Sequence, residues 1–484
     1  MTYKDPAQKT PLYEQLAAEI ARQIDQGTFR PGERIPSVRQ TSQQRHLSMT
    51  TVLQAYHLLE DRRMIEARPQ SGYFVLPRPV AVMREPETDA SAPDPTTVDI
   101  DDLVMMVQRD TANPRLVQFG CAIPDANLLP TEKLNRILAS LARGPEGAQN
   151  FAGLPAGVEE LRVQVARRAF PAGCSLSPDD IVITSGCTEA LNLALRAVSR
   201  PGGLVAIESP TYFGVLHILQ SLGLQALEIP THHRTGISLD ALRFALDHHS
   251  VSAVLVIPNF QNPLGSTMPD ENKRALVEML AEREIPLIED DLFGELYFGG
   301  QRPRVCKADD RTGGVILCSS FSKDLSPSYR IGWAAPGRYK TRFERLKSAT
   351  SLSTAVLPQL AIARFIANGG YDHHLRRIRR AYAEKVAAMS AAVSRFFPAG
   401  TRITAPEGSF VLWVQLPETA NALDLYRLAL KAGITIAPGH IFSTTPRYRN
   451  FIRLNAAYMS DDNAVALRRL AELATRVAGV AKTA

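Results

Sequence analysis

Lysine, hydroxyl and arginine side chains gather in the stretch ILCSSFSKDLSPSYRIGW, residues 316–333. Lys323 stands just past an apolar run, beside Ser320 and Ser322. Arg330 follows seven residues later. A solvated loop lysine is the plainest interpretation, because lysine is mostly an exposed residue. The chemical interpretation is that the amine forms a Schiff base with an aldehyde while the guanidinium binds an anion.

A second candidate for anion binding is IVITSGCTEALNLAL, residues 181–195. The pattern is typical of a strand followed by Ser185, Gly186 and Cys187 and then by a helix. Glycine lets the backbone approach a ligand closely, and a helix N-terminus offers free N–H groups, which favours phosphate. An ordinary strand-to-helix turn has a similar pattern, so this stretch alone does not establish a site.

Four more polar side chains stand at or inside apolar runs. Tyr212 follows a turn in ESPTYFGV, and Asn262 precedes a proline in IPNFQNPLG. Asp290 ends the run IPLIEDD. Burying an unpaired carboxylate there is costly, so we expect it to meet a cation or to face a cleft. Arg453 lies between apolar residues in FIRLNAAY, and its guanidinium suits bidentate pairing with a carboxylate.

Together these side chains offer a phosphate cradle, an aromatic plate, an amide, an acid, a lysine and an arginine. Pyridoxal phosphate bound with an amino acid requires all of these groups. The lysine would form a Schiff base with the cofactor aldehyde, and the acid would keep the pyridine nitrogen protonated, which makes the ring an electron sink. The combination favours ligand binding by Lys323 over a solvated loop.

The elements that must position these side chains alternate between strand and helix patterns. Apolar, β-rich runs occupy residues 204–209, 253–260, 285–291 and 314–321, with helical stretches between them. Such alternation predicts a large α/β domain with a mainly parallel sheet covered on both faces. Ligands of these sheets bind at the carboxyl ends of the strands, where the polar residues fall.

Residues 115–478 resemble a fold-type I aminotransferase, and the order of motifs matches throughout. The resemblance implies that Lys323 holds pyridoxal phosphate, that Asp290 pairs with the ring nitrogen and that Tyr212 stacks on the ring. It also implies that Asn262 bonds the ring hydroxyl and that Arg453 takes the carboxylate of a substrate or effector. The phosphate would be bound by a further set of residues: Ser185, Gly186, Cys187, Ser320, Ser322 and Arg330.

Three positions depart from the aminotransferase pattern. Phe293 stands where a tyrosine usually follows the nitrogen-binding Asp290, which removes a hydroxyl from the cofactor's phenolic oxygen. Phe151 stands where a tyrosine of the neighbouring subunit usually touches the phosphate, and Ala122 replaces a glycine near the expected carboxylate. We therefore expect the cofactor to bind and turnover to be weak or absent.

Residues 1–76 have the pattern of a small DNA-binding domain. Residues 38–45 and the segment from Ser48 predict two helices joined by a short turn, as in a helix-turn-helix. MIEARPQSGYFVL alternates around a Ser71-Gly72 turn, as a two-stranded wing does. A helical protein-binding module is the alternative. Residues 11–27 precede this pair with an apolar stripe typical of a further helix: Leu12, Leu16, Ile20 and Ile24.

The run PLYEQL, FRPGERIPSVR and LSMTTVLQAY resembles the winged helix-turn-helix of GntR-family regulators over the whole head. In such motifs the second helix reaches base edges of double-stranded DNA. One departure is Thr41-Ser42, where the family usually has Leu/Ala-Ala. The resemblance implies these contacts with DNA: Arg34, Ser37, Arg39, Ser48, Thr50, Thr51 and Gln54, with Gly72 at the tip of the wing.

A stretch rich in proline, acid and small residues, 77–99, predicts a tether, because it cannot bury enough apolar surface to order itself. A short helix is expected over 103–110. We therefore divide the chain into a winged helix-turn-helix at 1–76, a linker at 77–114 and an aminotransferase-like domain that binds pyridoxal phosphate at 115–484.

Composition sets further bounds. The five cysteines are dispersed and odd in number, as in a reduced cytosolic protein. No apolar run reaches 18 residues and the N-terminus lacks an apolar core, so we expect no membrane span and no signal peptide. Adjacent histidines point to different faces, so we expect solvated side chains and no metal site at 232–233, 248–249 and 373–374.

A GntR head tethered to such a body resembles the MocR subfamily of bacterial regulators. The resemblance implies a cytoplasmic homodimer that binds paired operator half-sites and senses pyridoxal phosphate, an amino acid or an amine. An active aminotransferase with an appended DNA-binding head is the alternative, favoured by Arg453. A pure interaction scaffold is a third, which Lys323, Asp290 and Asn262 oppose.

Overall fold

The computed structural model describes residues 11–25, 28–29, 32–61, 64–68, 71–75, 84–88, 93–98, 102–111, 113–144 and 154–479. The chain forms two compact units, Met1–Val82 and Met83–Ala484. Phe151 and residues 77–83 lie outside the described residues. Among the described residues, no helix is both long and apolar enough to cross a membrane.

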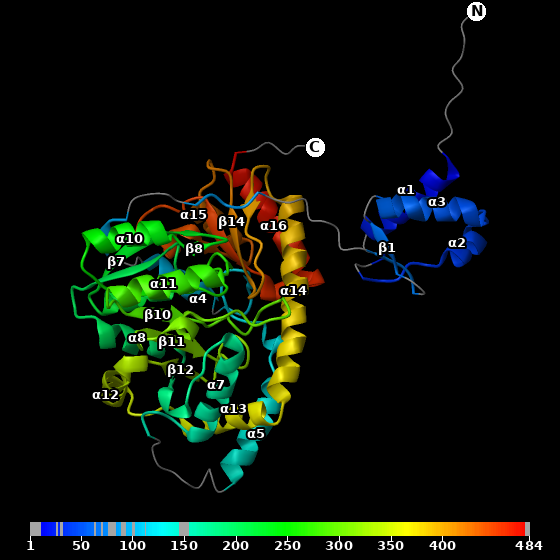
Figure 1. Cartoon of the computed structure of the whole chain (residues 1–484). Helices are drawn as coiled ribbons and strands as arrows, with labels where there is room; N and C mark the ends of the chain where they lie inside the picture. Colours follow the sequence, from blue (N-terminus) through cyan, green and yellow to red (C-terminus); the bar gives the residue numbers. More distant parts are fainter. Residues whose placement is uncertain are drawn as a thin grey trace, which may run out of the picture. The chain divides into compact units, whose positions relative to one another are not determined.

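The small unit is a three-helix head with a hairpin (Figure 1). Its elements are α1 (Leu12–Asp25), α2 (Val38–Arg45), α3 (Met49–Asp61), β1 (Ile65–Arg68) and β2 (Gly72–Val75). Leu16 and Ile20 of α1 pack with Val52 and Leu59 of α3 in one core. Leu12, predicted for the same stripe, is 59% exposed. The predicted helix-turn-helix and antiparallel wing are confirmed.

The turn between α1 and α2 is fixed by hydrogen bonds. Ser37 caps α2 in a capping box with Gln40. Buried Thr41 hydrogen-bonds the hydroxyl of Tyr56 at 2.8 Å, and Tyr56 donates to the carbonyl of Pro36 at 2.7 Å. The hydroxyl at position 41, unusual for the GntR pattern, therefore has a partner inside the head.

The large unit is built on a mixed, mainly parallel sheet with strand order β3-β7-β6-β9-β10-β11-β12-β5 and with β8 against β7. β6, β7, β9, β10 and β11 are parallel neighbours, whereas β12 runs antiparallel to β11 and β5. The strands are β3 (Pro95–Thr97), β5 (Val182–Thr184), β6 (Leu204–Ser209), β7 (Gln225–His232), β8 (Gly236–Ile237), β9 (Val251–Val256), β10 (Leu287–Asp290), β11 (Val315–Ser320) and β12 (Gly332–Ala335).

Helices cover both faces of this sheet (Figure 1). Alternate residues of β6 point to opposite faces: Val205 packs with α8 and α9, and Ala206 packs with α10 and α11. The predicted α/β architecture is thus confirmed. The helices of the large unit that precede the C-terminal part are α4 (Asp102–Thr111), α5 (Thr131–Arg143), α7 (Glu159–Ala169), α8 (Cys187–Val198), α9 (Phe213–Ser221), α10 (Leu239–His248), α11 (Asp270–Glu282), α12 (Lys340–Thr350) and α13 (Val356–Ala367).

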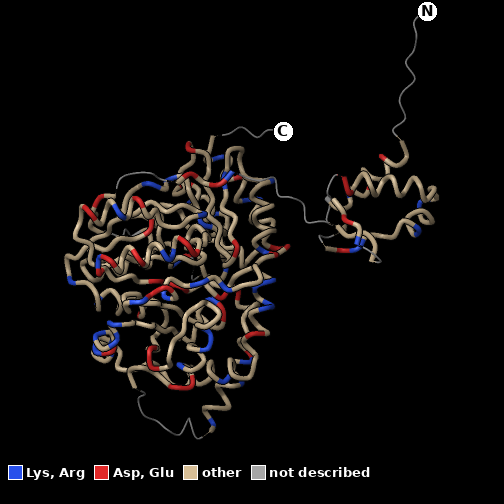
Figure 2. Tube along the Cα trace, viewed as in Figure 1, with Lys and Arg blue, Asp and Glu red and all other residues tan. Residues whose placement is uncertain are grey.

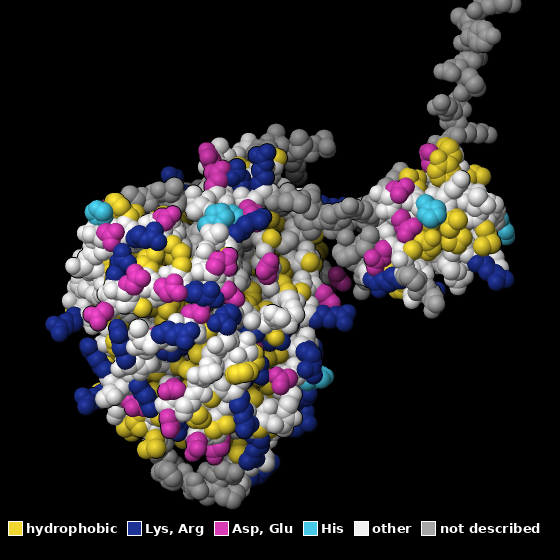
Figure 3. Space-filling view, in the orientation of Figure 1, with side chains coloured by type: hydrophobic (Ala, Val, Ile, Leu, Met, Phe, Trp, Pro, Cys, Tyr) yellow, Lys and Arg dark blue, Asp and Glu magenta, His cyan; other side chains and the backbone are white. Residues whose placement is uncertain are grey.

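The C-terminal part has its own sheet, of order β13-β14-β17-β16, and its own core around Trp413. β15 pairs separately with β4. Basic and acidic residues alternate along the trace of the large unit (Figure 2), and their side chains are interspersed over its visible face (Figure 3). The elements are β4 (Val117–Gln118), α14 (Gly370–Phe396), β13 (Arg402–Ile403), β14 (Val411–Gln415), α15 (Ala422–Lys431), β15 (Ile434–Thr435), β16 (Ala437–Pro438), β17 (Phe451–Asn455) and α16 (Asp461–Val477).

The described parts of the predicted tether lie on the large unit. β3 pairs antiparallel with β7, and Pro93 and Val98 are buried. Glu85 pairs with His233 and Arg234. The division between the two units at residues 82 and 83 therefore differs from the boundary at 114 that composition suggested. Acidic side chains that look solvated in the sequence have basic partners in the fold.

Candidate cofactor-binding site and DNA-binding surface

A cavity of about 340 Å³ opens where the strands of the large sheet end. The segments that follow β6, β9 and β11 place Tyr212, Asn262 and Lys323 in its wall, and Asp290 is the last residue of β10. Arg453 enters from β17 of the C-terminal sheet. Five residues that the sequence predicted for one site, which are up to 241 positions apart, thus line one cavity.

Lys323 lies inside this cavity and is not a solvated loop residue. Its Nζ donates to the carbonyl of Ala122 at 2.7 Å and lies 6.0 Å from the ring centre of Phe293. Burial lowers the pKa of the Lys323 ammonium to about 8, and the cation of Arg453 contributes to the lowering. A larger fraction of the amine is therefore neutral, and nucleophilic, at neutral pH than for an exposed lysine.

Asp290 faces Lys323 from the end of β10. Its Oδ1 accepts a hydrogen bond from the thiol of Cys187 at 3.4 Å and from the N–H of Leu292 at 3.0 Å. Burial raises the pKa of the Asp290 carboxyl to about 6, even though these two hydrogen bonds lower it. The carboxylate has no cation in contact among the described residues, which leaves it able to pair with a basic group of a ligand.

Two segments form a cup beside the cavity. Gly186, at φ +84°, precedes α8 and lies against the guanidinium of Arg330. Arg330 donates to the hydroxyl of Ser322 at 3.4 Å and to the carbonyl of Ser185 at 3.2 Å. The hydroxyl of Ser320 accepts from the N–H of Ser322 at 3.2 Å. The predicted phosphate-binding residues are therefore assembled around one helix N-terminus and one guanidinium.

Sequence reasoning missed the residues that hold this cup. The carboxylate of Glu189 accepts from the N–H of Ser185 at 2.5 Å and from the hydroxyl of Ser351 at 2.5 Å. Its other partner is the fully buried Lys347, at 3.2 Å. The acid four residues after Ser185 is a local signal that could have been found, whereas Lys347 and Ser351 are more than 150 positions away.

Arg453 is 1% exposed and has no carboxylate partner among the described residues. Its guanidinium donates to Oδ1 of Asn262 at 3.0 Å and to the carbonyl of Gly120. Its Nε has no hydrogen-bond partner in the described part of the chain. A buried, unsatisfied cationic donor is costly, so this group is suited to an anionic ligand such as a carboxylate.

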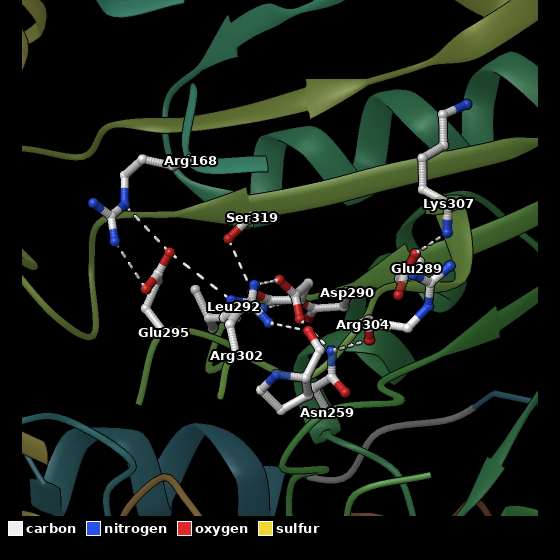
Figure 4. A network of polar contacts seen from close by, with 12 residues as sticks. Arg168, Asn259, Glu289, Asp290, Leu292, Glu295, Arg302, Arg304, Lys307 and Ser319 are labelled. Atoms are coloured by element: carbon white, nitrogen blue, oxygen red, sulfur yellow. Dashed lines mark hydrogen bonds and ion pairs between the residues drawn. The ribbon is translucent and has the colours of Figure 1, made fainter. Parts of the chain in front are cut away.

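The three consecutive acids at the end of β10, Glu289 to Asp291, have different partners (Figure 4). Glu289 accepts from the backbone N–H groups of Cys306 and Lys307. Asp291 points away from the cavity and pairs with Arg302 and Asn259. Only Asp290 of the three lines the cavity. The fold therefore separates a ligand-facing carboxylate from two structural ones, which the sequence alone could not do.

The exposed face of the head carries the residues predicted to contact DNA. Thr50 and Gln54 are exposed on α3, and Arg39 is exposed on α2. Ser48 caps α3 by accepting from the N–H of Thr51 at 3.0 Å. Met49 and Leu53, 56% and 40% exposed on α3, were not predicted to take part.

The tip of the wing lies beside an arginine. A Cβ added to Gly72, at φ +99°, would be 3.0 Å from Nε of Arg34, so glycine allows this arginine to lie against the hairpin. Both residues belong to the set predicted to contact DNA, and the fold brings them together at one edge of the head.

Two of the histidines interpreted as solvated are not. His233 is 10% exposed at its side chain and bonds Glu85 at 2.7 Å. His374 is 4% exposed, and its Nε2 lies 2.6 Å from the carbonyl oxygen of Asp324. The prediction failed because the partners come from segments 148 and 50 positions away.

The fold and the cavity define a protein of the fold-type I aminotransferase class. The family profile "Aminotransferase class I and II" matches residues 125–470, and "Bacterial regulatory proteins, gntR family" matches residues 12–75. The chain belongs to the MocR type of GntR-family regulators, in which a helix-turn-helix unit is fused to an aminotransferase-like unit.

Relatives of both kinds support this assignment. The HTH-type transcriptional regulators YdcR and YjiR of Escherichia coli K12 are 41% and 38% identical to this chain. The matches cover 92% and 96% of this chain and 95% and 99% of the relatives. The crystal structure of the alpha-aminoadipate aminotransferase LysN from Thermus thermophilus, complexed with N-(5'-phosphopyridoxyl)-L-leucine, is 29% identical. It superimposes with a TM-score of 0.71 over 77% of this chain and 95% of that one.

Proposed function

We propose that this regulator binds pyridoxal phosphate covalently at Lys323 and responds to the cofactor or to its adduct with an amino acid or amine. The observation that carries the proposal is the half-buried Lys323, whose amine shares one cavity with Asp290 and with the incompletely bonded Arg453. The phosphopyridoxyl-leucine ligand of the related LysN structure supports the same cofactor class.

The cavity residues fit this cofactor in charge and in shape. When bound, pyridoxal phosphate supplies an aldehyde that a primary amine attacks and a ring that withdraws electrons. Lys323 would hold the aldehyde carbon, and Asp290 would hold the proton of the ring nitrogen. Tyr212 would lie against the ring, and Asn262 would donate to the ring oxygen.

The two anionic ends of the ligand, its phosphate and its carboxylate, would each meet a positively charged side chain. Arg330 and the α8 N-terminus at Gly186 would bind the phosphate, together with Ser185, Cys187, Ser320 and Ser322. Arg453 would bind the carboxylate of the amino acid, because its Nε lacks a partner in the described residues. An amine effector without a carboxylate would leave that donor unsatisfied, so the site favours amino acids.

The head would bind double-stranded DNA with α3 in the major groove. Thr50, Thr51 and Gln54 would reach base edges, and Arg34 and Arg39 would bind phosphates. Ser37, Ser48 and Gly72 complete the proposed contact set. Two copies of the chain in a cytoplasmic homodimer would place two heads on paired half-sites.

Absorbance of the purified full-length protein tests the cofactor. We expect a band in the visible or near-ultraviolet region after pyridoxal phosphate is added, which disappears in Lys323→Ala. Selection of duplexes from random sequence tests the head: Arg39→Ala should lose DNA binding and keep the band. Absence of any band from the wild-type protein would refute the cofactor proposal.

A second candidate function is transamination. The buried Arg453, which is suited to a substrate carboxylate, favours it. Phe293 disfavours it, because its ring packs edge-on against Phe410 at 5.6 Å and offers no hydroxyl near Lys323. Repeated turnover of amino donor and oxo-acid acceptor by the purified protein would support the enzyme, whereas a single stoichiometric reaction would support the sensor.

A further inference from the structure

One wall of the cofactor cavity belongs to the segment that leads to the head. Val107 and Gln108 of α4 line the cavity together with Lys323 and Arg453. Among the described residues, α4 is the first helix of the large unit, and sequence reasoning placed it in the linker. Whatever fills the cavity beside Gln108 therefore touches the helix that follows residues 84–88 and 93–98, the described part of the large unit nearest in sequence to the DNA-binding unit.

α4 also packs on the C-terminal part of the large unit. Val104 and Val107 are each 3% exposed and belong to the core around Trp413. The hydroxyl of Tyr426, on α15, donates to the carboxylate of Asp110. The position of α4 thus depends both on the contents of the cavity and on the C-terminal sheet.

Upstream of α4 the chain continues along the edge of the large sheet. Thr96 and Thr97 of β3 pair with Ala226 and Gln225 of β7. The hydroxyl of Thr96 bonds that of Thr444 at 2.8 Å. This strand holds the chain on the large unit between α4 and the residues that precede it.

The first described residues of the large unit, 84–88, are held by two acids, which we call the clasp: Glu85 and Glu87. One Oε of Glu85 lies 2.7 Å from Nε2 of His233 and 2.7 Å from Nε of Arg234. Burial raises the pKa of Glu85, but the hydrogen bonds from Arg234 and His233 outweigh it and lower the pKa overall. Glu87 binds Arg402 at 2.5 Å, and its N–H donates to the side chain of Gln415 at 3.0 Å.

We propose that α4, β3 and the clasp form one connection that reports the occupancy of the cavity to the head. The inference rests on the proposed function of the cavity and adds the route of regulation. A ligand shifts a conformational equilibrium only through contacts that differ between the two states, and Val107 and Gln108 supply such contacts. The clasp fixes where the chain leaves the large unit, so its loss should separate ligand binding from the response of the head.

Hydrogen exchange of the full-length chain tests the route. The probes are pyridoxal phosphate and phosphopyridoxyl-L-leucine, each added to cofactor-free protein. We expect the second compound to slow exchange at residues 102–111 and also at 95–98 and 84–88. Unchanged exchange at 84–98 in protein that shows the cofactor band would overturn the route and leave the proposed function standing.

Variants test the clasp. In the wild type we expect phosphopyridoxyl-L-leucine to change the affinity of the protein for a selected DNA duplex by about fivefold or more. In Glu85→Ala the same compound should change that affinity by less than about twofold. Arg234→Gln, which changes the other side of the pair, should act in the same direction. The matched control is Glu384→Ala, which removes a surface ion pair with Arg380 on α14 and should keep the full response.

Each outcome distinguishes the proposals. A Glu85→Ala variant that binds the compound and keeps the wild-type change in DNA affinity would refute the clasp. Wild-type protein that forms no cofactor band would refute the proposed function itself. The inference is supported by a Glu85→Ala variant that forms the cofactor band and binds phosphopyridoxyl-L-leucine with wild-type affinity. In this variant the compound should no longer change the affinity for DNA.

Discussion

Arg330 and Gly186 are in direct contact: a methyl group added to Gly186 would lie 2.3 Å from Nη2 of Arg330. Arg330 itself has a positive φ of 52°, which is uncommon for a residue with a side chain. The cup therefore depends on a residue without Cβ at position 186, both for its φ of +84° and for the approach of the guanidinium.

Gly186→Ala should weaken pyridoxal phosphate binding, because the methyl group displaces Arg330 from the phosphate. The matched control is Gly202→Ala, at φ +80° with no atom within 4 Å of the added methyl. Both variants should lose unfolding free energy from the positive φ: about 1 kcal/mol at Gly202, and about 1–3 kcal/mol at Gly186, whose ψ of 172° lies in a region essentially restricted to glycine. Only the first should lose cofactor affinity in an absorbance titration, and equal affinities in the two variants would contradict this role of Gly186.

Covalent capture of the cofactor should depend on pH through Lys323. The neutral amine is the attacking form, and its pKa is lowered to about 8 by burial. The initial rate of capture should rise about tenfold per pH unit below that value and level off above it. An exposed lysine in a short peptide is the control, and its rate should continue to rise toward pH 10. A rise that continues to pH 10 for the protein as well would show that the amine is not desolvated.

Asp290→Asn should stabilise the cofactor-free protein at pH 7 while weakening cofactor binding. The folded pKa of Asp290 is raised from 3.8 to about 6, chiefly by burial, so its ionised form destabilises the fold. The gain in unfolding free energy should be complete above pH 6. It should disappear as pH falls below 3.8, where the Asp290 carboxyl is protonated in both the folded and the unfolded state.

Asp291→Asn is the matched control for this variant, because the neighbouring carboxylate is paired with Arg302. Loss of the Asp291 carboxylate leaves Arg302 without this buried partner and should lower the free energy of unfolding by about 3 kcal/mol. Chemical denaturation at several pH values measures both effects, and a loss of stability in Asp290→Asn at pH 7 would contradict the assignment.

Tyr56→Phe should destabilise the head without affecting the large unit. The change leaves the hydroxyl of Thr41 and the carbonyl of Pro36 without this partner, at a cost of about 1–3 kcal/mol. Tyr56→Phe combined with Thr41→Ala should recover part of the loss, because one buried polar group is then removed. Hydrogen exchange in α2 and α3 measures the effect, and additive losses in the double variant would argue against coupling of the two hydroxyls.

Local patterns predicted the strands and the polar residues at their ends. β6 has the predicted bounds 204–209, because its residues are buried on both faces and form a continuous apolar run. Lys323, Asp290 and Asn262 could be predicted because each follows or ends such a run, and the carboxyl ends of parallel strands meet at one edge.

Contacts between distant segments could not be predicted in this way. Glu85 and His233 are 148 positions apart, and neither has a local pattern that differs from that of a solvated residue. Gln108 lies on a short helix that composition placed in a linker, and its place in the cavity wall depends on the packing of α4 against the C-terminal core. Such pairs are set by tertiary packing, which leaves no periodicity in the sequence.

The clasp sets a length limit within the large unit. Glu85 is anchored to the turn between β7 and β8 and Glu87 to the C-terminal sheet, and their Cα atoms can be at most about 7 Å apart. If these two sheets separate by more than a few ångströms, one of the two ion pairs must break. Glu87, 61% exposed against 25% for Glu85, is the one that water replaces more easily.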